Sequence, residues 1–131
     1  MATGSSCQLI SSHRDLIVWQ KSMDLVDIVY DLTDRFPKRE YFALVPQISR
    51  SVVSVPANIA EGQARVTARD FANFLVIARS SLMETETLLT VAVRRAYAKQ
   101  SEAVPAYVLI TEISKMLTAL RARILSAKRR S

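Results

Sequence analysis

The segment that most constrains the fold of this chain is residues 67–99, "TARDFANFLVIARSSLMETETLLTVAVRRAYAK". It holds neither glycine nor proline, so nothing in it interrupts a long helix. Its apolar residues recur every three or four positions, which is the spacing of an amphipathic helix. Thr67 is a suitable N-cap, with Asp70 as its capping partner. At 1.5 Å per residue this helix would be roughly 45–50 Å long. Its predicted core-facing side chains are Phe71, Phe74 or Leu75, Ala78, Leu82, Leu89, Ala92 and Ala96.

The rest of the chain predicts three further helices. Of its 131 residues, 50% are hydrophobic, two are glycine and four are proline, a composition that suits helices joined by short turns. The spacing of apolar residues predicts helices over residues 14–34, 46–62 and 104–127. The last of these should direct Tyr107, Ile110, Ile113, Leu117, Leu120 and Ile124 into the core.

Short connections make successive helices antiparallel neighbours in space. We therefore expect an all-α protein, a single antiparallel up-down-up-down four-helix bundle over residues 14–127. A flexible N-terminal tail over residues 1–13 and a basic C-terminal tail over residues 128–131 should flank it.

The first predicted helix carries two apolar stripes. One stripe is predicted to face the core, and Ser11 or Ser12 is placed to cap the helix. A helix this apolar should also pack against a partner chain, which predicts a homo-oligomer. The predicted core stripe is Leu16, Trp19, Met23, Val26 and Tyr30, and the predicted partner-facing set is Val18, Leu25, Val29 and Leu32.

The second predicted helix combines an apolar stripe with a polar one. Pro56 should bend this helix, and Gly62 should end it by adopting a positive φ. Three interpretations of the polar stripe stay open: a solvent-facing surface, a structural hydrogen-bond network, or a ligand site. The apolar stripe is Ile48, Val52, Val55 and Ile59, and the polar stripe is Gln47, Ser51, Ser54, Asn58 and Glu61.

The positive charge is concentrated in the second half of the chain. The formal net charge is +6, and residues 67–131 hold eleven Lys/Arg against five Asp/Glu. Such an excess favours a polyanion, RNA or DNA, although a solvated helix end or an anionic protein or membrane surface would give the same pattern. The candidate nucleic-acid contacts are Arg94, Arg95, Lys99, Arg121, Arg123, Lys128, Arg129 and Arg130, with Arg50, Arg65 and Arg69 as secondary contacts.

No residue pattern supports catalysis, a metal or a cofactor. His13 is the only histidine, Cys7 the only cysteine, and Gly4 and Gly62 are the only glycines, which excludes a Glu-x-x-His metal motif and a glycine-rich phosphate loop. The Tyr and Phe residues fall on core stripes, which disfavours a base-stacking platform. With no secretory signal and no apolar run near the ~18 residues of a membrane span, we expect a cytoplasmic protein without a membrane partner.

Several motifs lie in the predicted helices, in all but the last, and in the turn after the first. These motifs are Val18-Trp19-Gln20, Phe36-Pro37 with Glu40, Gln47-Ile48 with Arg50, residues 58–62, Phe71 with Phe74-Leu75, and Ser81-Leu82 with Glu84. Together they resemble the four-helix bundle protein family of bacterial 23S rRNA intervening sequences, the S23-type proteins, and the resemblance covers residues 16–125.

The resemblance implies a fold similar to the accessory proteins of diversity-generating retroelements. Those proteins are four-helix bundles that form ring-like pentamers with a basic surface and act with nucleic acid and a reverse transcriptase. The implied role is a non-catalytic, homo-oligomeric and pentameric module that binds nucleic acid. The resemblance also favours the interpretation of Asn58, Glu61 and Gly62 as a structural polar network. The alternative is a protein-interaction scaffold whose basic surface serves only solubility.

Overall fold

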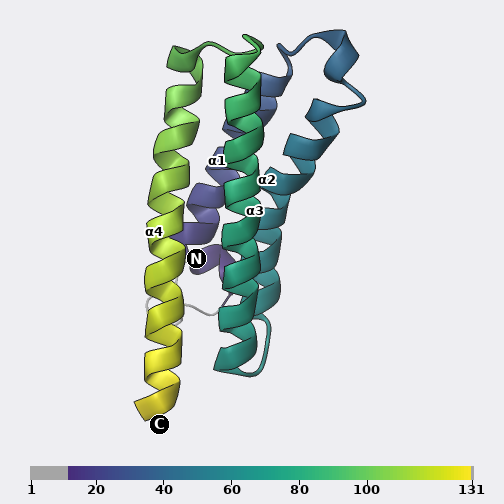
Figure 1. Ribbon diagram of the computed structural model, residues 1–131. Coiled ribbons are helices and arrows are strands. Elements are labelled where there is room, and N and C mark those ends of the chain that lie inside the picture. The colour runs from purple at the N-terminus through teal and green to yellow at the C-terminus, as the bar shows by residue number, and fades with distance from the viewer. Residues whose placement is uncertain (1–11, 131) are drawn as a thin grey trace, which may run out of the picture.

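The protein is built of four long helices in the part of the chain that the structure, a computed structural model, describes (Figure 1). This part is residues 12–130, with side chains up to residue 127; Cys7 and Ser11 lie outside it, as does most of the predicted N-terminal tail. No strand occurs in it, which confirms the all-α prediction. The helices are α1 (Ile17–Thr33), α2 (Leu44–Gln63), α3 (Ala68–Arg94) and α4 (Gln100–Arg130), with short 3-10 helices η2 (His13–Asp15) and η3 (Lys38–Glu40).

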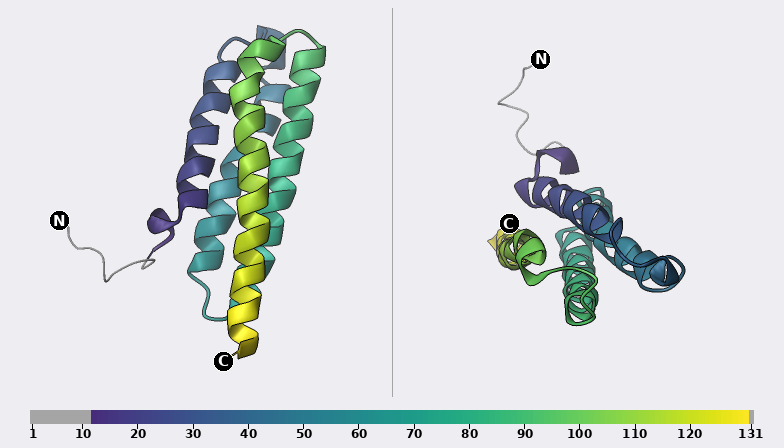
Figure 2. Two further views of the ribbon diagram at one scale, coloured as in Figure 1. Left: turned by 90° about the vertical axis from the view of Figure 1, so that its left-hand side faces the viewer. Right: turned by 90° about the horizontal axis from the view of Figure 1, so that it is seen from above.

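The four helices form a bundle in which each packs against two others. Helix α1 contacts α2 and α4, and α3 contacts the same two helices from the other side (Figure 2). The connections 34–43 and 95–99 lie at one end of the bundle, here called the upper end. The connection 64–67 and the last turns of α4 lie at the opposite, lower end (Figure 1).

The predicted apolar stripe of α2 is the centre of the core. Ile48, Val52, Val55 and Ile59 are all fully buried, as the sequence predicted. Helices α3 and α4 meet this stripe with further predicted core residues. These are Leu75, Ala78, Leu82, Leu89 and Ala92 from α3, and Ile110, Ile113 and Leu117 from α4.

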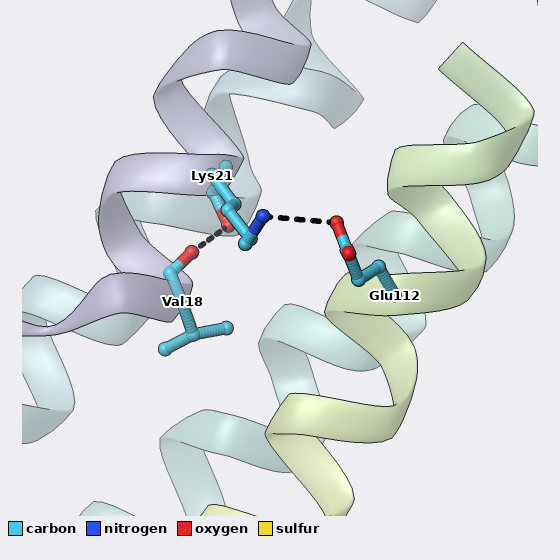
Figure 3. Close-up of polar contacts among 4 residues, drawn as sticks. Val18, Lys21 and Glu112 are labelled. Atoms are coloured by element: carbon cyan, nitrogen blue, oxygen red, sulfur yellow. Dashed lines mark hydrogen bonds and ion pairs between the residues drawn. The ribbon is translucent and has the colours of Figure 1, made fainter. Parts of the chain in front are cut away.

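The predicted orientation of α1 is wrong. The stripe assigned to a partner chain, Val18, Leu25, Val29 and Leu32, is buried in this chain's own core. Ser22 lies on the same stripe and donates its hydroxyl to the Val18 carbonyl at 2.7 Å (Figure 3).

The stripe assigned to the core is only partly in it. Leu16 is buried, and Trp19 and Val26 pack partly buried against the core, but Met23 is 39% and Tyr30 45% exposed. The aspartates of α1 explain the difference. Facing this stripe inward would turn Asp27 and Asp34 toward the core, where an unpaired carboxylate is very unfavourable. In the observed orientation both are exposed.

Two glutamates set helix starts earlier than the sequence predicted. Helix α2 begins at Leu44, because Glu40 accepts a hydrogen bond from the Leu44 N–H at 3.2 Å. Helix α4 begins at Gln100, because Glu102 accepts from the Lys99 N–H at 3.0 Å. This bond, assisted by the nearby Arg35, holds the pKa of the Glu102 carboxyl below its ordinary value. The stability that the ionised Glu102 carboxylate contributes to the fold is therefore present at neutral pH, and it is lost as the pH falls through that lowered pKa.

Helix α4 also differs from prediction at its far end and in its composition. It runs to Arg130, so residues 128–130 of the predicted basic tail continue the helix. By length and composition alone, its segment Gln100–Ala127 could cross a membrane, although no such span was expected. Only 28% of its most apolar window is buried inside the bundle. Among the described large apolar side chains of α4, Val104 and Val108 are exposed, while the others are buried or partly buried, most of them packed against the core.

Gly62 does not end α2 with a positive φ, contrary to the sequence prediction. It lies inside the helix, is buried, and has no positive φ. A Cβ atom placed on it would lie 2.7 Å from the Cβ of Phe74 and 3.2 Å from the carbonyl oxygen of Phe71. The glycine is therefore required by the close approach of α3, not by the backbone conformation.

The positive φ falls instead at Ala96, which was predicted to face the core but is exposed. It ends α3 after Arg94, where the sequence predicted a helix continuing to Lys99. The Ala96 N–H donates to the Val93 carbonyl, and the Tyr97 N–H donates to the Ala92 carbonyl. This pair of bonds is the Schellman motif, in which the position held by Ala96 favours glycine.

Replacing Gly62 with alanine should destabilise the bundle by about 1–3 kcal/mol, because the new methyl group overpacks the α2–α3 contact. Chemical unfolding of the purified protein measures this difference. If glycine only weakened the helix, the same substitution would stabilise the protein by about 1 kcal/mol. The sign of the change decides between the two.

Replacing Ala96 with glycine should stabilise the protein by about 0.5–1 kcal/mol, because it relieves a left-handed conformation that costs a residue with a Cβ roughly 1–2 kcal/mol. Ala57→Gly, at an exposed position within α2, is the matched control and should destabilise by about 1 kcal/mol. Equal destabilisation by both glycines would contradict the assigned helix end.

Candidate nucleic-acid interface

Three of the predicted nucleic-acid contacts lie together at the upper end. Arg94 and Arg95 end α3, and Lys99 directly precedes α4. All three side chains are exposed, and none has an ion-pair or hydrogen-bond partner for its cationic group among the described residues. Cations at a helix C-terminus are favourable, so the end of α3 tolerates this concentration of charge.

Glu40 and Glu102, two of the acidic residues of the upper end, are already bonded, whereas Asp34 has no side-chain partner among the described residues. Glu40 accepts from the Leu44 N–H with one oxygen and from the Tyr97 hydroxyl, at 2.9 Å, with the other. Glu102 accepts from the Lys99 N–H and pairs with Arg35. Neither carboxylate neutralises Arg94 or Arg95.

Arg39 joins these cations, although the sequence did not single it out. Its guanidinium lies 5.5 Å from the centroid of the Tyr97 ring. Arg39 and Arg95 line one cleft of about 490 Å³, together with Glu40, Gln47 and Tyr97. Because η3 and the end of α3 are distant in sequence, only the packing of Tyr97 against Phe36 and Arg39 brings them together.

The predicted cations of the lower end are divided among several faces. Arg65 is occupied, since it pairs with Glu61 at 2.7 Å and lies 4.7 Å from the Phe74 ring centroid. Arg121 lines a groove between α3 and α4, and Arg123 lines a different one beside the start of α1.

The remaining five predicted contacts lie in different parts of the chain. Arg69 is exposed in the first turn of α3, at the lower end. Arg50 is exposed within α2, between the two ends. The side chains of Lys128, Arg129 and Arg130 lie outside the described residues.

The polar stripe of α2 bonds to α3 through hydroxyl groups. Ser51 contacts Thr85, and Ser54 contacts Ser81, each with 2.8 Å between the oxygen atoms. Asn58 donates to the carbonyl and the hydroxyl of Ser54 at 2.8 and 2.9 Å. Asn58 is therefore bonded into this network.

Glu61 and Gly62 are not members of that hydrogen-bond network. Glu61 is exposed and bonded to Arg65, while Gly62 contributes only close packing. Ser81 and Thr85 are members that the sequence analysis missed. Their spacing of four residues on α3, comparable to that of Ser51 and Ser54 on α2, is the signal that could have identified them.

One aromatic pair contradicts the expectation that every Tyr and Phe faces the core. Phe42 is 95% exposed, and Tyr41 beside it is also exposed, in the connection between η3 and α2. Both lie at the upper end.

The described residues contain no group of three or more His, Cys, Asp or Glu side chains placed to hold a metal ion.

Comparison with known proteins identifies the family. A family model described as 23S rRNA-intervening sequence protein matches residues 14–119, which is most of the chain. The chain belongs to this family. A crystal structure of a protein of unknown function from the S23 ribosomal protein family of Bacteroides thetaiotaomicron is similar, with 31% identity and a TM-score of 0.72. That match covers 80% of this chain and 98% of the other. A search of the curated proteins found no match.

The region matched by the family model includes only one of the two groups of cations. Arg94, Arg95 and Lys99 lie inside the region shared with 23S rRNA-intervening sequence proteins. Arg121 and the basic residues that follow it lie beyond that region. The upper-end cations are therefore part of the matched bundle, and the cations at the end of α4 extend it.

Asn58→Ala should destabilise this family member by about 1–3 kcal/mol, because it removes both hydrogen bonds to Ser54 from a partly buried network. Thermal unfolding measures the loss, and Gln47→Ala, at an exposed position of α2, should change stability by less than about 0.5 kcal/mol. Nucleic-acid affinity of the folded variant should not change. An unchanged melting temperature with lost binding would make Asn58 a ligand contact.

Proposed function

We propose that this chain is a non-catalytic homo-oligomer that binds nucleic acid through its cationic ends. Its architecture would be the antiparallel up-down-up-down bundle, assembled as a ring-like pentamer in the cytoplasm. The observation that carries the proposal is the state of charge at the upper end. The cationic groups of Arg94, Arg95 and Lys99 form no ion pair among the described residues, although the charge of Lys99 interacts with Glu102. Glu40 and Glu102 are held by hydrogen bonds and an ion pair to other groups.

Free cations of this kind suit phosphate groups, which contribute affinity without reading sequence. A single upper end offers only a few contacts, and these would bind weakly. A ring would repeat the same cations at each subunit, and multivalency would raise the avidity of the weak contacts. Binding should therefore depend on assembly and should be largely independent of sequence.

Homo-oligomerisation is supported by exposed apolar side chains on two helices. Met23 and Tyr30 on α1, and Val104 and Val108 on α4, are all at least 39% exposed. Sedimentation equilibrium at micromolar concentration should give a mass several times that of the 14.7 kDa chain. A monomer under these conditions would contradict the proposed assembly.

Affinity for RNA or DNA should fall steeply with salt, with a log–log slope of about −0.7 to −0.9 per phosphate neutralised. Replacing Arg94, Arg95 and Lys99 with glutamine should flatten the slope by up to about three phosphate equivalents for each engaged end. Fluorescence anisotropy with a labelled oligonucleotide across a salt series measures both.

The matched control exchanges the same three cations without removing charge: Arg94→Lys, Arg95→Lys and Lys99→Arg. Because phosphate contacts of this kind depend mainly on charge, the control should keep the wild-type slope. Absence of binding by the wild type even at low salt would refute the nucleic-acid role.

A protein-interaction scaffold without a nucleic-acid role is the second candidate, with a reverse transcriptase or another protein as partner. The exposed Phe42 favours it, because large aromatic side chains on a surface are frequent anchors of protein interfaces. Phe42→Ala should leave the salt slope unchanged. If it abolished capture of a protein partner from a lysate while nucleic-acid binding was absent, the scaffold function would replace the first proposal.

A further inference from the structure

Helix α1 presents a row of four aspartates to the outside of the bundle. Asp24, Asp27, Asp31 and Asp34, the last directly after the helix, recur at steps of three and four, so they share one side, and all four are exposed. They lie away from the buried stripe, and Met23 and Tyr30 are exposed beside them. We call these four aspartates the acidic face of α1.

No cation among the described side chains neutralises the acidic face. The two basic residues nearest to it in sequence, Lys21 and Arg35, are paired with α4 instead, with Glu112 at 3.1 Å and with Glu102 (Figure 3 shows the first pair). The four aspartates have no ion-pair or side-chain hydrogen-bond partner in the described part of the chain. Like charges three or four residues apart destabilise a helix by a few tenths of a kcal/mol per pair. The isolated chain therefore bears a cost that an external cationic surface would remove.

The same chain carries a surface of opposite character on α4 and the adjoining side of α3. Its upper half is a hollow of about 520 Å³ on α4 alone, lined by Gln100, Val104, Tyr107, Val108 and Thr111. Its lower half is a groove of about 450 Å³, whose exposed rim includes Val76, Arg79 and Arg121. The described side chains that line the two hollows include no acidic residue.

Lys115 lies on α4 between these two hollows and is exposed. Arg79 is held beside it, because its Nε donates to the Ser114 hydroxyl at 3.2 Å. Neither cation has an acidic partner among the described residues. We call this surface, from Val104 down to Arg121 with Val76 and Arg79, the α3/α4 face. Glu112 also lies in this stretch of α4, but it is paired with Lys21 of α1. The other charged side chains of the α3/α4 face are basic, and apolar side chains lie beside them, as they do beside the acidic face of α1.

We propose that the acidic face of α1 in one copy docks on the α3/α4 face of a second copy. In this contact Asp27 and Asp31 would pair with Arg79 and Lys115, and the neighbouring apolar side chains would cover the exposed part of α4. The inference rests on the homo-oligomer of the proposed function and names the surfaces that form it.

Charge complementarity within one chain argues for a second copy as the occupant. Each copy carries both surfaces, and they lie on different helices, since α1 packs mainly against α2 and α4. A copy therefore cannot satisfy its own acidic face. Two different surfaces meeting between copies make a heterologous contact, which closes into a ring when the rotation between subunits allows it.

Charge reversal tests the contact directly. Asp27→Lys/Asp31→Lys places cations against the α3/α4 face, and Arg79→Glu/Lys115→Glu places acids against the acidic face. Each double variant should weaken assembly at least tenfold, because like charges would face each other at the contact. The chain carrying all four substitutions should assemble as the wild type does. Sedimentation velocity over a concentration series of the full chain measures each assembly.

Arg14→Glu/Lys38→Glu is the matched control for the Arg79/Lys115 reversal, with the same change of charge at exposed positions outside both surfaces and outside the candidate nucleic-acid contacts; its assembly should equal that of the wild type. Circular dichroism melts establish that every variant is folded. If the two double variants keep the assembly mass of the wild type, this inference is wrong, but the proposed homo-oligomer still stands. A folded four-substitution chain that stays monomeric would also overturn it, and a monomeric wild type would overturn both proposals.

Discussion

The close contact between α2 and α3 is the constraint on which the rest of the bundle depends. At its lower part the contact leaves no room for a Cβ on Gly62, because Phe71 and Phe74 fill that space. Higher up, hydroxyl pairs bridge the same two helices, with every buried polar side chain of the described residues satisfied. Small groups and short bonds fix both the spacing and the register of the pair. Helices α1 and α4 then complete the core against this base.

The orientation of α1 on that base decides the character of the surface. Burying the stripe from Val18 to Leu32 turns the aspartates of α1 outward. The bundle thus separates three kinds of surface: an acidic face on α1, an apolar and basic face on α3 and α4, and cationic ends. In the proposed assembly the first two meet between copies. The ends remain free for polyanions, so one charge pattern would serve both association and binding.

The sequence predicted those parts of the fold that follow from local pattern. The N-cap at Thr67 and the buried stripe of α2 follow from spacing along one helix, and Arg94, Arg95 and Lys99 are grouped because they are close in sequence. Features that depend on contacts with a neighbouring helix could not be predicted from the sequence. Periodicity gives α1 two apolar stripes and cannot choose between them without weighing where the aspartates point. Glycine at position 62 fits a helix end as well as a close contact, and nothing in the residue type marks Ala96 as left-handed. Arg39 enters the upper-end cleft only through contacts with a distant segment.

Native-state hydrogen exchange on the full chain tests most directly whether the α2–α3 pair is the base of the fold. Amides exchange most slowly where opening requires unfolding of the whole domain. If α2 and α3 form the base, the slowest amides lie in residues 48–60 of α2 and 78–89 of α3, with α1 and the last turns of α4 opening earlier. Slowest exchange in α1 and α4, with α2 and α3 opening first, would contradict the dependence of the bundle on that contact.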